Sequence, residues 1–355
     1  MAAVLALIVG AVAAVQLTHT PNVARTTPPT LAPAIKPPGS LAPSTSSPST
    51  ATGGIPAKVD PAIVDITTVV AGGHAAGTGM ILSSGGEVLT NNHVIDGATS
   101  ITVSVGGTSQ ARPASIVGYD ATHDVAVIQI ADASNLPAVS IGDSGAVAIG
   151  DPVVALGNAL GRGGVPAVAN GKVTGLDQTV TASGAGAAPE TLHNMIETNA
   201  QIQPGDSGGP LVDSQARVIG MDTAGSTTGR STKATLGYAI PINNALDIAH
   251  QIEKGQSSST IQIGTRGIVG VQVGESTTTP GALVKVVEAG SPAEKAGLAA
   301  GDVITKVRGR SIDSSAAMGQ ALTGARPGDR VDITWVDGSG ANHTATISLI
   351  PGPPN

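Results

Sequence analysis

The chain has 355 residues, a formal net charge of −7 and only 18 lysine and arginine residues, which are scattered along its length. This length predicts two or three domains, and the sparse positive charge argues against nucleic acid as a partner. The chain contains no cysteine, which excludes disulfides, thiol catalysis and cysteine-ligated zinc. Its seven histidines form no metal-binding motif, so no metal or other cofactor is expected.

The first residues form an almost unbroken apolar run from Met1 to Val15. The run is shorter than the ~20 residues that span a membrane and matches a signal-peptide core of roughly 7 to 15 residues. No basic residue precedes it, which indicates that the natural start lies further upstream. In that case the segment would be longer and would remain as an anchor. We therefore expect residues 1–17 to be a signal sequence or membrane anchor of an extracytoplasmic protein, whose membrane contact is limited to this segment.

Residues 18–60 are rich in proline, threonine, serine and alanine. Such a stretch buries too little apolar surface to offset the entropy cost of ordering it, which predicts a disordered linker. An apolar run followed by such a spacer is typical of a domain held away from a membrane or wall.

From residue 61 the pattern changes to short β-rich runs separated by glycine, aspartate and asparagine. With no phenylalanine, the cores must be built mainly from valine, isoleucine, leucine and alanine, and β-branched residues favour strands. One set of strands is predicted at 62–70, 78–82, 87–90, 101–105, 114–119 and 125–130, which suits one barrel. A second set is predicted at 152–156, 171–176, 179–182, 195–199, 210–212, 217–223 and 237–242.

The first clear helix is predicted at 243–255, with Asn243 as its N-cap and Gly255 at its end. Residues 255–260 are then expected to form a short flexible link. A separate pattern follows, with strands at 267–273, 282–287, 302–307, 331–335 and 342–349 and helices at 291–297 and 314–322.

A candidate nucleophile lies in the sequence Gly205-Asp206-Ser207-Gly208-Gly209. A serine hydroxyl needs a base to accept its proton and donors that stabilise the oxyanion formed by its attack. The glycines allow a tight turn that could aim the amides of Gly205 and Ser207 at one point, as in an oxyanion hole. The same residues also fit the nucleophile elbow of α/β-hydrolases or a plain glycine-rich turn.

Chain order separates the two enzyme classes. His93 follows the predicted strand 87–90, and Asp124 directly precedes the predicted strand 125–130. The order His93, Asp124, Ser207 is that of the chymotrypsin type, whereas α/β-hydrolases place the acid and the base after the serine. Asp120 is the nearest competitor of Asp124, but no apolar strand follows it directly, so we interpret it as a turn residue.

The three motifs at 90–93, 123–130 and 203–211, in this order and followed by a PDZ-like segment, resemble the HtrA (DegP-like) family of serine endopeptidases, in particular its actinobacterial members. The resemblance implies a mostly β fold: a chymotrypsin-like double β-barrel protease domain at 61–255, then a PDZ domain at 262–350. It implies that His93 is the base, Asp124 orients it, and Ser207 is the nucleophile. It also implies that Asp206 supports the oxyanion turn and that the chain can form a homotrimer.

The substrate pocket can be placed by analogy with chymotrypsin-like enzymes. Gln201, six positions before Ser207, would lie at its base, followed by Ile202, and Thr223 and Ala224 would form the opposite wall. No aspartate stands at the base, so we expect a preference for small to medium apolar residues rather than lysine or arginine.

In the PDZ-like segment, the amides of Ile268, Val269 and Gly270 would receive a peptide carboxylate, and the peptide would extend the sheet beside Val271. The sequence therefore predicts an endopeptidase that acts on misfolded or specific envelope proteins, with unfolded chains and C-terminal peptides as partners. The alternative is a catalytically idle chaperone or peptide-binding protein.

Overall fold

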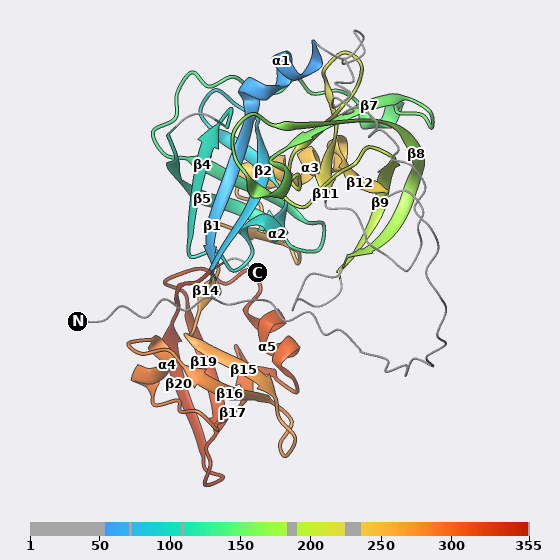
Figure 1. Ribbon diagram of the computed structural model, residues 1–355. Coiled ribbons are helices and arrows are strands. Elements are labelled where there is room, and N and C mark those ends of the chain that lie inside the picture. Colours follow the sequence, from blue (N-terminus) through green and yellow to red (C-terminus); the bar gives the residue numbers. More distant parts are fainter. Residues whose placement is uncertain (1–53, 71–72, 108–109, 183–189, 224–235, 354–355) are drawn as a thin grey trace, which may run out of the picture. The chain divides into compact units, whose positions relative to one another are not determined.

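The computed structural model describes residues 54–70, 73–107, 110–182, 190–223 and 236–353 (Figure 1). The predicted signal or anchor segment 1–17 lies outside these residues, as does most of the predicted linker 18–60. Among the residues that are described, none of the helices combines the length and the apolar character needed to cross a bilayer.

Two short helices lie where the sequence predicted the end of the linker. Helix α1 (Ile55–Val59) and the 3-10 helix η1 (Asp60–Ala62) precede the first strand. Ile55 and Val59 lie one helical turn apart and are 5% and 3% exposed, because both pack into the hydrophobic core of the protease domain. The predicted linker boundary at residue 60 is therefore wrong, because two apolar residues before it, Ile55 and Val59, pack into the core.

The first barrel has six strands, β1 (Ile63–Val70), β2 (Gly73–Ile81), β3 (Glu87–Thr90), β4 (Ser100–Val105), β5 (Arg112–Asp120) and β6 (Val125–Ile130). They follow the order β5-β4-β1-β2-β3-β6, and β5 also pairs with β6, which closes the ring. The short helix α2 (Asn92–Ile95) follows β3, so His93 lies on a helical turn. The interior is filled by aliphatic side chains such as Ile66, Ile81 and Ile128, none of which is exposed.

The second barrel is closed in the order β10-β11-β12-β9-β8-β7. Its strands are β7 (Pro152–Gly157), β8 (Ala167–Ala182), β9 (Glu190–Thr198), β10 (Pro210–Val212), β11 (Val218–Thr223) and β12 (Gly237–Pro241). The two strands predicted at 171–176 and 179–182 are one long strand, β8. The polar residues between them form a bulge rather than a turn, since the register shifts between Gly175 and Gln178, and Asp177 has a φ of 54°.

Helix α3 (Ile242–Glu253) packs its buried face, which includes Ala245, Ala249 and Ile252, against the protease core. The predicted N-cap is wrong, because the helix starts at Ile242. Asn243 instead donates through Nδ2 to Asp143 Oδ1 at 2.8 Å. The predicted flexible link at 255–260 is followed by a strand that the sequence did not indicate: β13 (Ile261–Ile263) pairs with β5.

The C-terminal domain is built on a sheet of order β15-β16-β17-β19-β20, with β14 pairing with β21. Its elements are β14 (Gly267–Ile268), β15 (Val271–Glu275), β16 (Ala282–Val287), α4 (Pro292–Ala296), β17 (Val303–Val307), β18 (Arg310–Ser311), α5 (Ser315–Leu322), β19 (Arg330–Val336), β20 (Asn342–Ser348) and β21 (Ile350–Pro351). The predicted strand 267–273 is divided at Gly270, whose φ of 83° suits a glycine and breaks the extended run.

Candidate active site

His93 and Asp124 form a direct pair. The Nδ1 atom of His93 lies 2.8 Å from Asp124 Oδ2 and 3.0 Å from Oδ1, and the backbone amide of His93 donates to Oδ1 at 2.9 Å. The Asp124 side chain is only 2% exposed, whereas that of His93 is 42% exposed. A carboxylate at Nδ1 favours the tautomer that carries its proton there, so Nε2 is the nitrogen that can accept a proton.

Asp124 is held from both barrels. Its backbone is in the left-handed region, with a φ of 55°, and its carbonyl oxygen accepts a hydrogen bond from Asn91 Nδ2 at 2.9 Å. From the second barrel, Thr223 Oγ1 donates to Asp124 Oδ2 at 3.4 Å. Thr223 was predicted as a pocket wall, and its buried hydroxyl is found at the carboxylate. No local sequence signal could have indicated this contact, because it joins residues of different barrels.

The Ser207 turn packs on the first barrel. The Ser207 carbonyl accepts a hydrogen bond from the amide of Thr78 at 2.9 Å, and Thr78 Oγ1 donates to the Gly205 carbonyl at 2.7 Å. Gly208 has a φ of 86°, and a Cβ atom there would lie 2.1 Å from Thr78 O and 2.3 Å from Thr90 Oγ1. Thr90 ends β3, so the turn lies against the segment that leads directly into His93.

Gly205 and Asp206, the two residues before Ser207, are fixed by close packing and by a hydrogen bond. Gly205 has a φ of 99°, and a Cβ atom there would lie 2.3 Å from Asn158 O, so only glycine fits without displacement. Asp206 is 4% exposed, and its Oδ2 accepts a hydrogen bond from the amide of Gln203 at 2.8 Å. Burial raises the pKa of Asp206, and the Gln203 amide counters part of that increase. The Asp206 carboxyl thus stabilises the turn through a hydrogen bond to its backbone.

A second buried carboxyl, that of Asp222 on β11, lies under the same turn. Its backbone carbonyl accepts from the Gly208 amide at 2.8 Å, and its own amide donates to Gly209 O at 2.7 Å. Neither side-chain oxygen has a hydrogen-bond partner among the described residues. Burial, and secondly the charge of Asp206, raises the pKa of Asp222 well above 3.8. The sequence reasoning missed Asp222, although a carboxylate within the apolar run 218–223 was a visible signal.

The other predicted pocket residues differ in environment. Gln201 is exposed, whereas Ile202 is 5% exposed and packs in a core cluster with Leu211 and Ile219. Ala224 lies outside the described residues. The described residues therefore do not delineate the predicted pocket.

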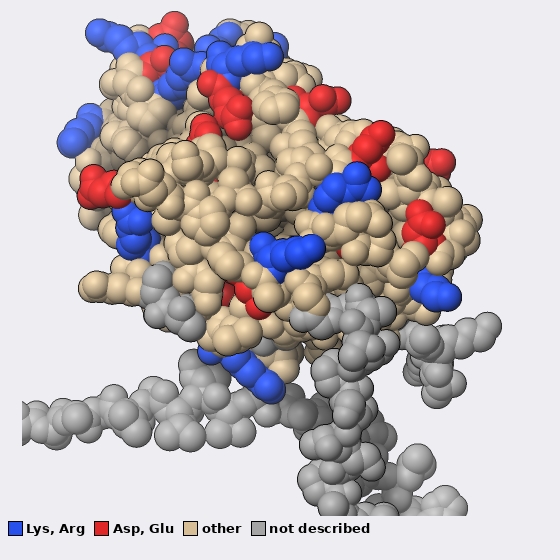
Figure 2. All heavy atoms as spheres, turned by 90° about the horizontal axis from the view of Figure 1, so that it is seen from above, with Lys and Arg blue, Asp and Glu red and all other residues tan. Residues whose placement is uncertain are grey.

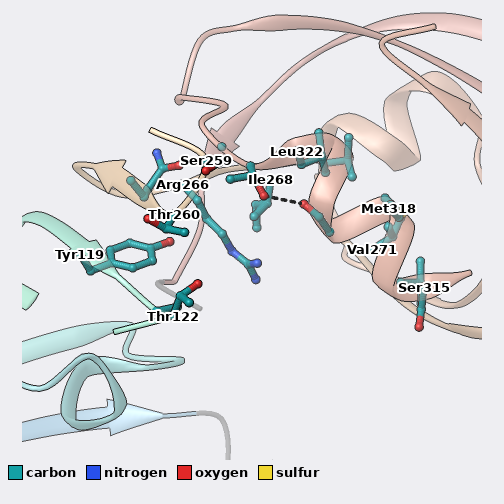
Figure 3. A pocket seen from close by; sticks show the side chains of 17 residues that line it. Tyr119, Thr122, Ser259, Thr260, Arg266, Ile268, Val271, Ser315, Met318 and Leu322 are labelled. Atoms are coloured by element: carbon teal, nitrogen blue, oxygen red, sulfur yellow. Dashed lines mark hydrogen bonds between the residues drawn. The ribbon is translucent and has the colours of Figure 1, made fainter. Parts of the chain in front are cut away.

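The C-terminal domain offers a groove between β15 and α5. Its apolar lining from this domain includes Val271, Met318 and Leu322 (Figure 3). Strand β15 is an edge strand of its sheet. The predicted loop precedes it: the Val269 carbonyl accepts from the Ala293 amide at 3.0 Å, and the Gly270 carbonyl accepts from the Glu288 amide at 2.9 Å. Both carbonyls thus accept hydrogen bonds from residues of the same domain.

Figure 2 shows one face of the molecule, on which acidic and basic side chains are interspersed on a largely uncharged surface. No single sign of charge dominates the visible part of this face. A field that would steer a polyanion is therefore not apparent in this view.

Comparisons with known proteins agree with the two halves of the structure. A trypsin-like peptidase domain model matches residues 77–221, and a PDZ domain model matches residues 267–349. Serine protease PepD of Mycobacterium tuberculosis is 36% identical over 313 residues, which are 83% of this chain and 65% of that protein. Serine protease Do-like HtrA of Lactococcus lactis is 34% identical over 77% of this chain and 70% of its own length.

The same likeness extends to a further relative and to a solved structure. Serine protease Do-like HtrA of Bacillus subtilis is 35% identical, but this chain covers only 56% of it. A serine-to-alanine variant of the HtrA-type protease AlgW, solved with a tripeptide, is 32% identical with a TM-score of 0.50, over 84% of this chain and 97% of that one. These matches confirm the predicted double barrel followed by a PDZ domain. The chain belongs to the HtrA family of serine proteases.

Proposed function

We propose that this protein is a serine endopeptidase in which Ser207 is the nucleophile, His93 the general base and Asp124 the group that orients it. The observation that carries this proposal is the contact of 2.8 Å between His93 Nδ1 and Asp124 Oδ2. The Ser207 turn packs against Thr90, three residues before this histidine. The names of the relatives, which are serine proteases, support it. The assembled pair also favours an enzyme over a catalytically idle chaperone.

The reaction follows from these roles. Ser207 Oγ attacks the peptide carbonyl carbon while His93 Nε2 takes its proton, and Asp124 stabilises the imidazolium that results. The amides of Gly205 and Ser207 would donate to the oxyanion of the tetrahedral intermediate. On collapse, His93 returns the proton to the leaving amine, which leaves an acyl group on Ser207. A water molecule, deprotonated by His93, then releases the second product and restores the hydroxyl.

The substrates proposed are misfolded or specific proteins of the cell envelope. Relatives named as periplasmic serine proteases in Haemophilus influenzae and Halomonas elongata support a location outside the cytoplasm. Tethering through residues 1–17 and assembly as a homotrimer are finer parts of the same proposal. The PDZ domain would bind peptide C-termini along the edge of β15, with Ile268, Val269 and Gly270 around the carboxylate.

The triad assignment is tested with Ser207→Ala. We expect this variant to lose hydrolysis of casein and of short peptides by a factor on the order of 10⁶, and to lose labelling by an organophosphonate probe. The matched control is Ser214→Ala, which removes an exposed hydroxyl of the same barrel. A folded wild-type protein that the probe does not label, or a Ser207→Ala variant that still digests casein, would overturn the proposal.

A further inference from the structure

The turn that carries Asp124 is short and needs support. Strand β5 ends at Asp120 and β6 begins at Val125, and these two residues are register partners. Within the turn, Asp124 adopts a φ of 55°, a conformation that residues other than glycine rarely adopt. Such a backbone persists only where its surroundings over-determine it. The direction of the Asp124 carboxylate, and so its contact with His93, depends on what fixes this turn.

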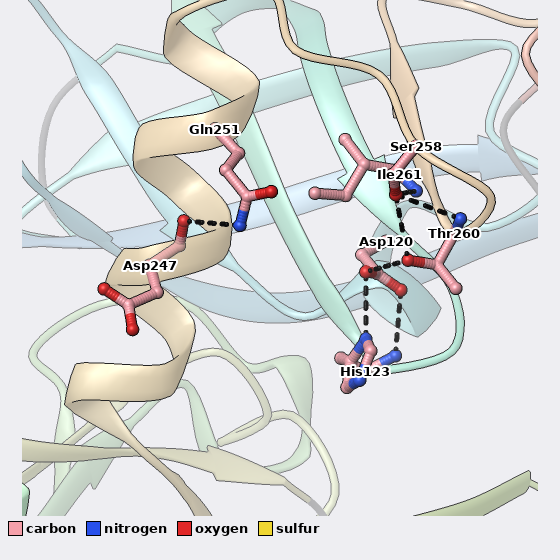
Figure 4. A network of polar contacts seen from close by, with 7 residues as sticks. All are labelled: Asp120, His123, Asp247, Gln251, Ser258, Thr260 and Ile261. Carbon is pink, nitrogen blue, oxygen red and sulfur yellow. Dashed lines mark hydrogen bonds and ion pairs between the residues drawn. The ribbon is translucent and has the colours of Figure 1, made fainter.

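The carboxylate of Asp120 closes the turn from inside (Figure 4). It accepts a hydrogen bond from the backbone amide of His123 at 3.1 Å, and its Oδ2 lies 2.9 Å from His123 Nδ1. The Asp120 side chain is 1% exposed, whereas that of His123 is 56% exposed. A carboxylate shielded from water makes strong hydrogen bonds, so Asp120 firmly holds the residue that directly precedes Asp124.

The same carboxylate also receives a donor from a distant part of the chain. Thr260 Oγ1 donates to Asp120 Oδ2 at 2.8 Å. Thr260 is itself fixed by Ser258, whose Oγ accepts from the amides of Thr260 at 3.2 Å and Ile261 at 3.0 Å (Figure 4). These residues lie in the segment that connects α3 to the PDZ domain.

Strand β13 fastens this segment to the end of β5. Ile261 is the register partner of Asp120, and Ile261 is 3% exposed within the protease core. The approach is close, because a Cβ atom at Gly118 would lie 2.6 Å from Gln262 O. The connecting segment is therefore built into the first barrel at the residue that supports the turn of Asp124.

We propose that Asp120 is a positioning residue for Asp124, and that Thr260 links the segment leading to the PDZ domain to this support. The inference rests on the role proposed above for Asp124. Loss of the Thr260 hydroxyl frees one side of the Asp120 carboxylate, so the turn gains mobility and Asp124 spends less time aligned with His93. The chemical step then slows, whereas binding of a short peptide at the proposed specificity pocket is unaffected, because neither residue belongs to that pocket; Thr260 lines the groove beside β15 instead.

The test uses the full chain with Thr260→Val and Asp120→Asn. Thr260→Val removes the hydroxyl at nearly constant volume, and Asp120→Asn removes the charge. On a short peptide substrate we expect kcat to fall about three- to tenfold for Thr260→Val and more than tenfold for Asp120→Asn, with KM changed by less than twofold. The double variant should resemble Asp120→Asn alone, because both changes act on the same Thr260–Asp120 contact and their effects are then not additive. Thr260→Ser, which restores a hydroxyl, should recover most of kcat.

Two control variants remove comparable groups elsewhere. Thr99→Val deletes a hydroxyl that donates to Val69 O at 3.0 Å in the same barrel. Asp337→Asn alters a carboxylate that holds a turn of the PDZ domain, where its Oδ2 lies 2.7 Å from His343 Nε2. Neither should change kcat. Each measurement is scaled to the fraction of active sites that an organophosphonate probe titrates, which separates a slower step from partial unfolding.

A second readout does not depend on turnover. The proton on His93 Nδ1 should give a low-field NMR signal in the wild-type protein, and this signal should shift or broaden in Thr260→Val. Unchanged kcat and an unchanged signal in both Asp120→Asn and Thr260→Val would overturn this inference alone. A folded wild-type chain that neither hydrolyses peptide nor takes up the probe would overturn the proposed function and this inference with it.

Discussion

Asp222 lies beneath the proposed catalytic turn, and the ionisation of its carboxyl opposes folding. Its side chain is fully buried, and its carboxyl oxygens have no hydrogen-bond partner among the described residues. Burial, and secondly the charge of Asp206, raises its pKa well above 3.8, so the folded chain binds this proton more tightly than the unfolded chain does. The stabilising contribution of that proton is complete below pH 3.8 and is lost as the pH rises through the raised pKa.

Replacement of Asp222 by Asn should therefore stabilise the protein at neutral pH, because the amide remains uncharged. We expect the free energy of unfolding at pH 7 to increase, and its decrease between pH 4 and neutrality to become shallower. Urea unfolding at a series of pH values measures both effects. Asp247→Asn, which makes the same exchange on the exposed side of α3, serves as the control. A variant less stable than the wild type at pH 7 would contradict the argument.

Gly208 is a second residue at which local geometry decides the outcome. Alanine there would combine a φ of 86° with a Cβ atom 2.1 Å from a backbone oxygen of β2, so the turn itself must shift. We expect Gly208→Ala to fold with reduced stability and to lose peptide hydrolysis by at least tenfold. The matched control is Gly97→Ala, which has a φ of 67° but no atom within 4 Å of the added carbon. Its cost should be limited to the strain of a left-handed backbone, about 1–2 kcal/mol.

At the scale of elements, the best-predicted strands are those that the residues of the strand itself and of its flanking turns determine. The predicted bounds of β3, β6 and β10 agree with the structure, because each is a short β-rich run bordered by turn residues. The errors occurred where distant pairing decides. The polar residues within β8 are accommodated by a bulge that only its pairing with β9 reveals. Strand β13 could not be distinguished from a linker in the sequence, because it becomes a strand through its pairing with β5.

The residues of the proposed site also fall into those that the sequence could predict and those that it could not. His93, Asp124 and Ser207 could be predicted because their motifs and chain order are visible in the sequence. The contacts of Thr223 with Asp124 and of Thr260 with Asp120 could not, since each joins residues that are about 100 or more positions apart. Supporting residues of this kind carry no motif, and only the folded chain identifies them.

Strand β13 yields a prediction about where the PDZ domain can be removed. A chain that ends after Gly264 keeps β13, whereas a chain that ends after Ser257 loses it together with the buried Ile261 side chain. Loss of a buried isoleucine typically costs about 2–5 kcal/mol. We expect the shorter chain to unfold at a clearly lower urea concentration and to have a lower kcat on peptides. Equal midpoints for the two truncated chains would show that β13 does not stabilise the barrel.

At the scale of the whole molecule, the two barrels are joined where the proposed chemistry takes place. Thr78 of β2 binds the Ser207 turn through both its amide and its hydroxyl, and Thr223 of β11 reaches across to Asp124. The seam between the barrels is therefore itself part of the site. A change in how the barrels meet would alter the nucleophile turn and the orienting acid together.

The closed ring of the second barrel has a consequence for a protein proposed to work among misfolded chains. A sheet with an open side can recruit sticky polypeptides into edge-to-edge aggregates, and that hazard grows where denatured proteins are concentrated. Among the strands that the structure describes, those of the barrel that holds Ser207 form a closed ring, whereas β15 lies at the end of its own sheet. Under the proposed function, β15 therefore offers a strand edge for main-chain pairing with a denatured polypeptide, whereas the described strands of the second barrel do not.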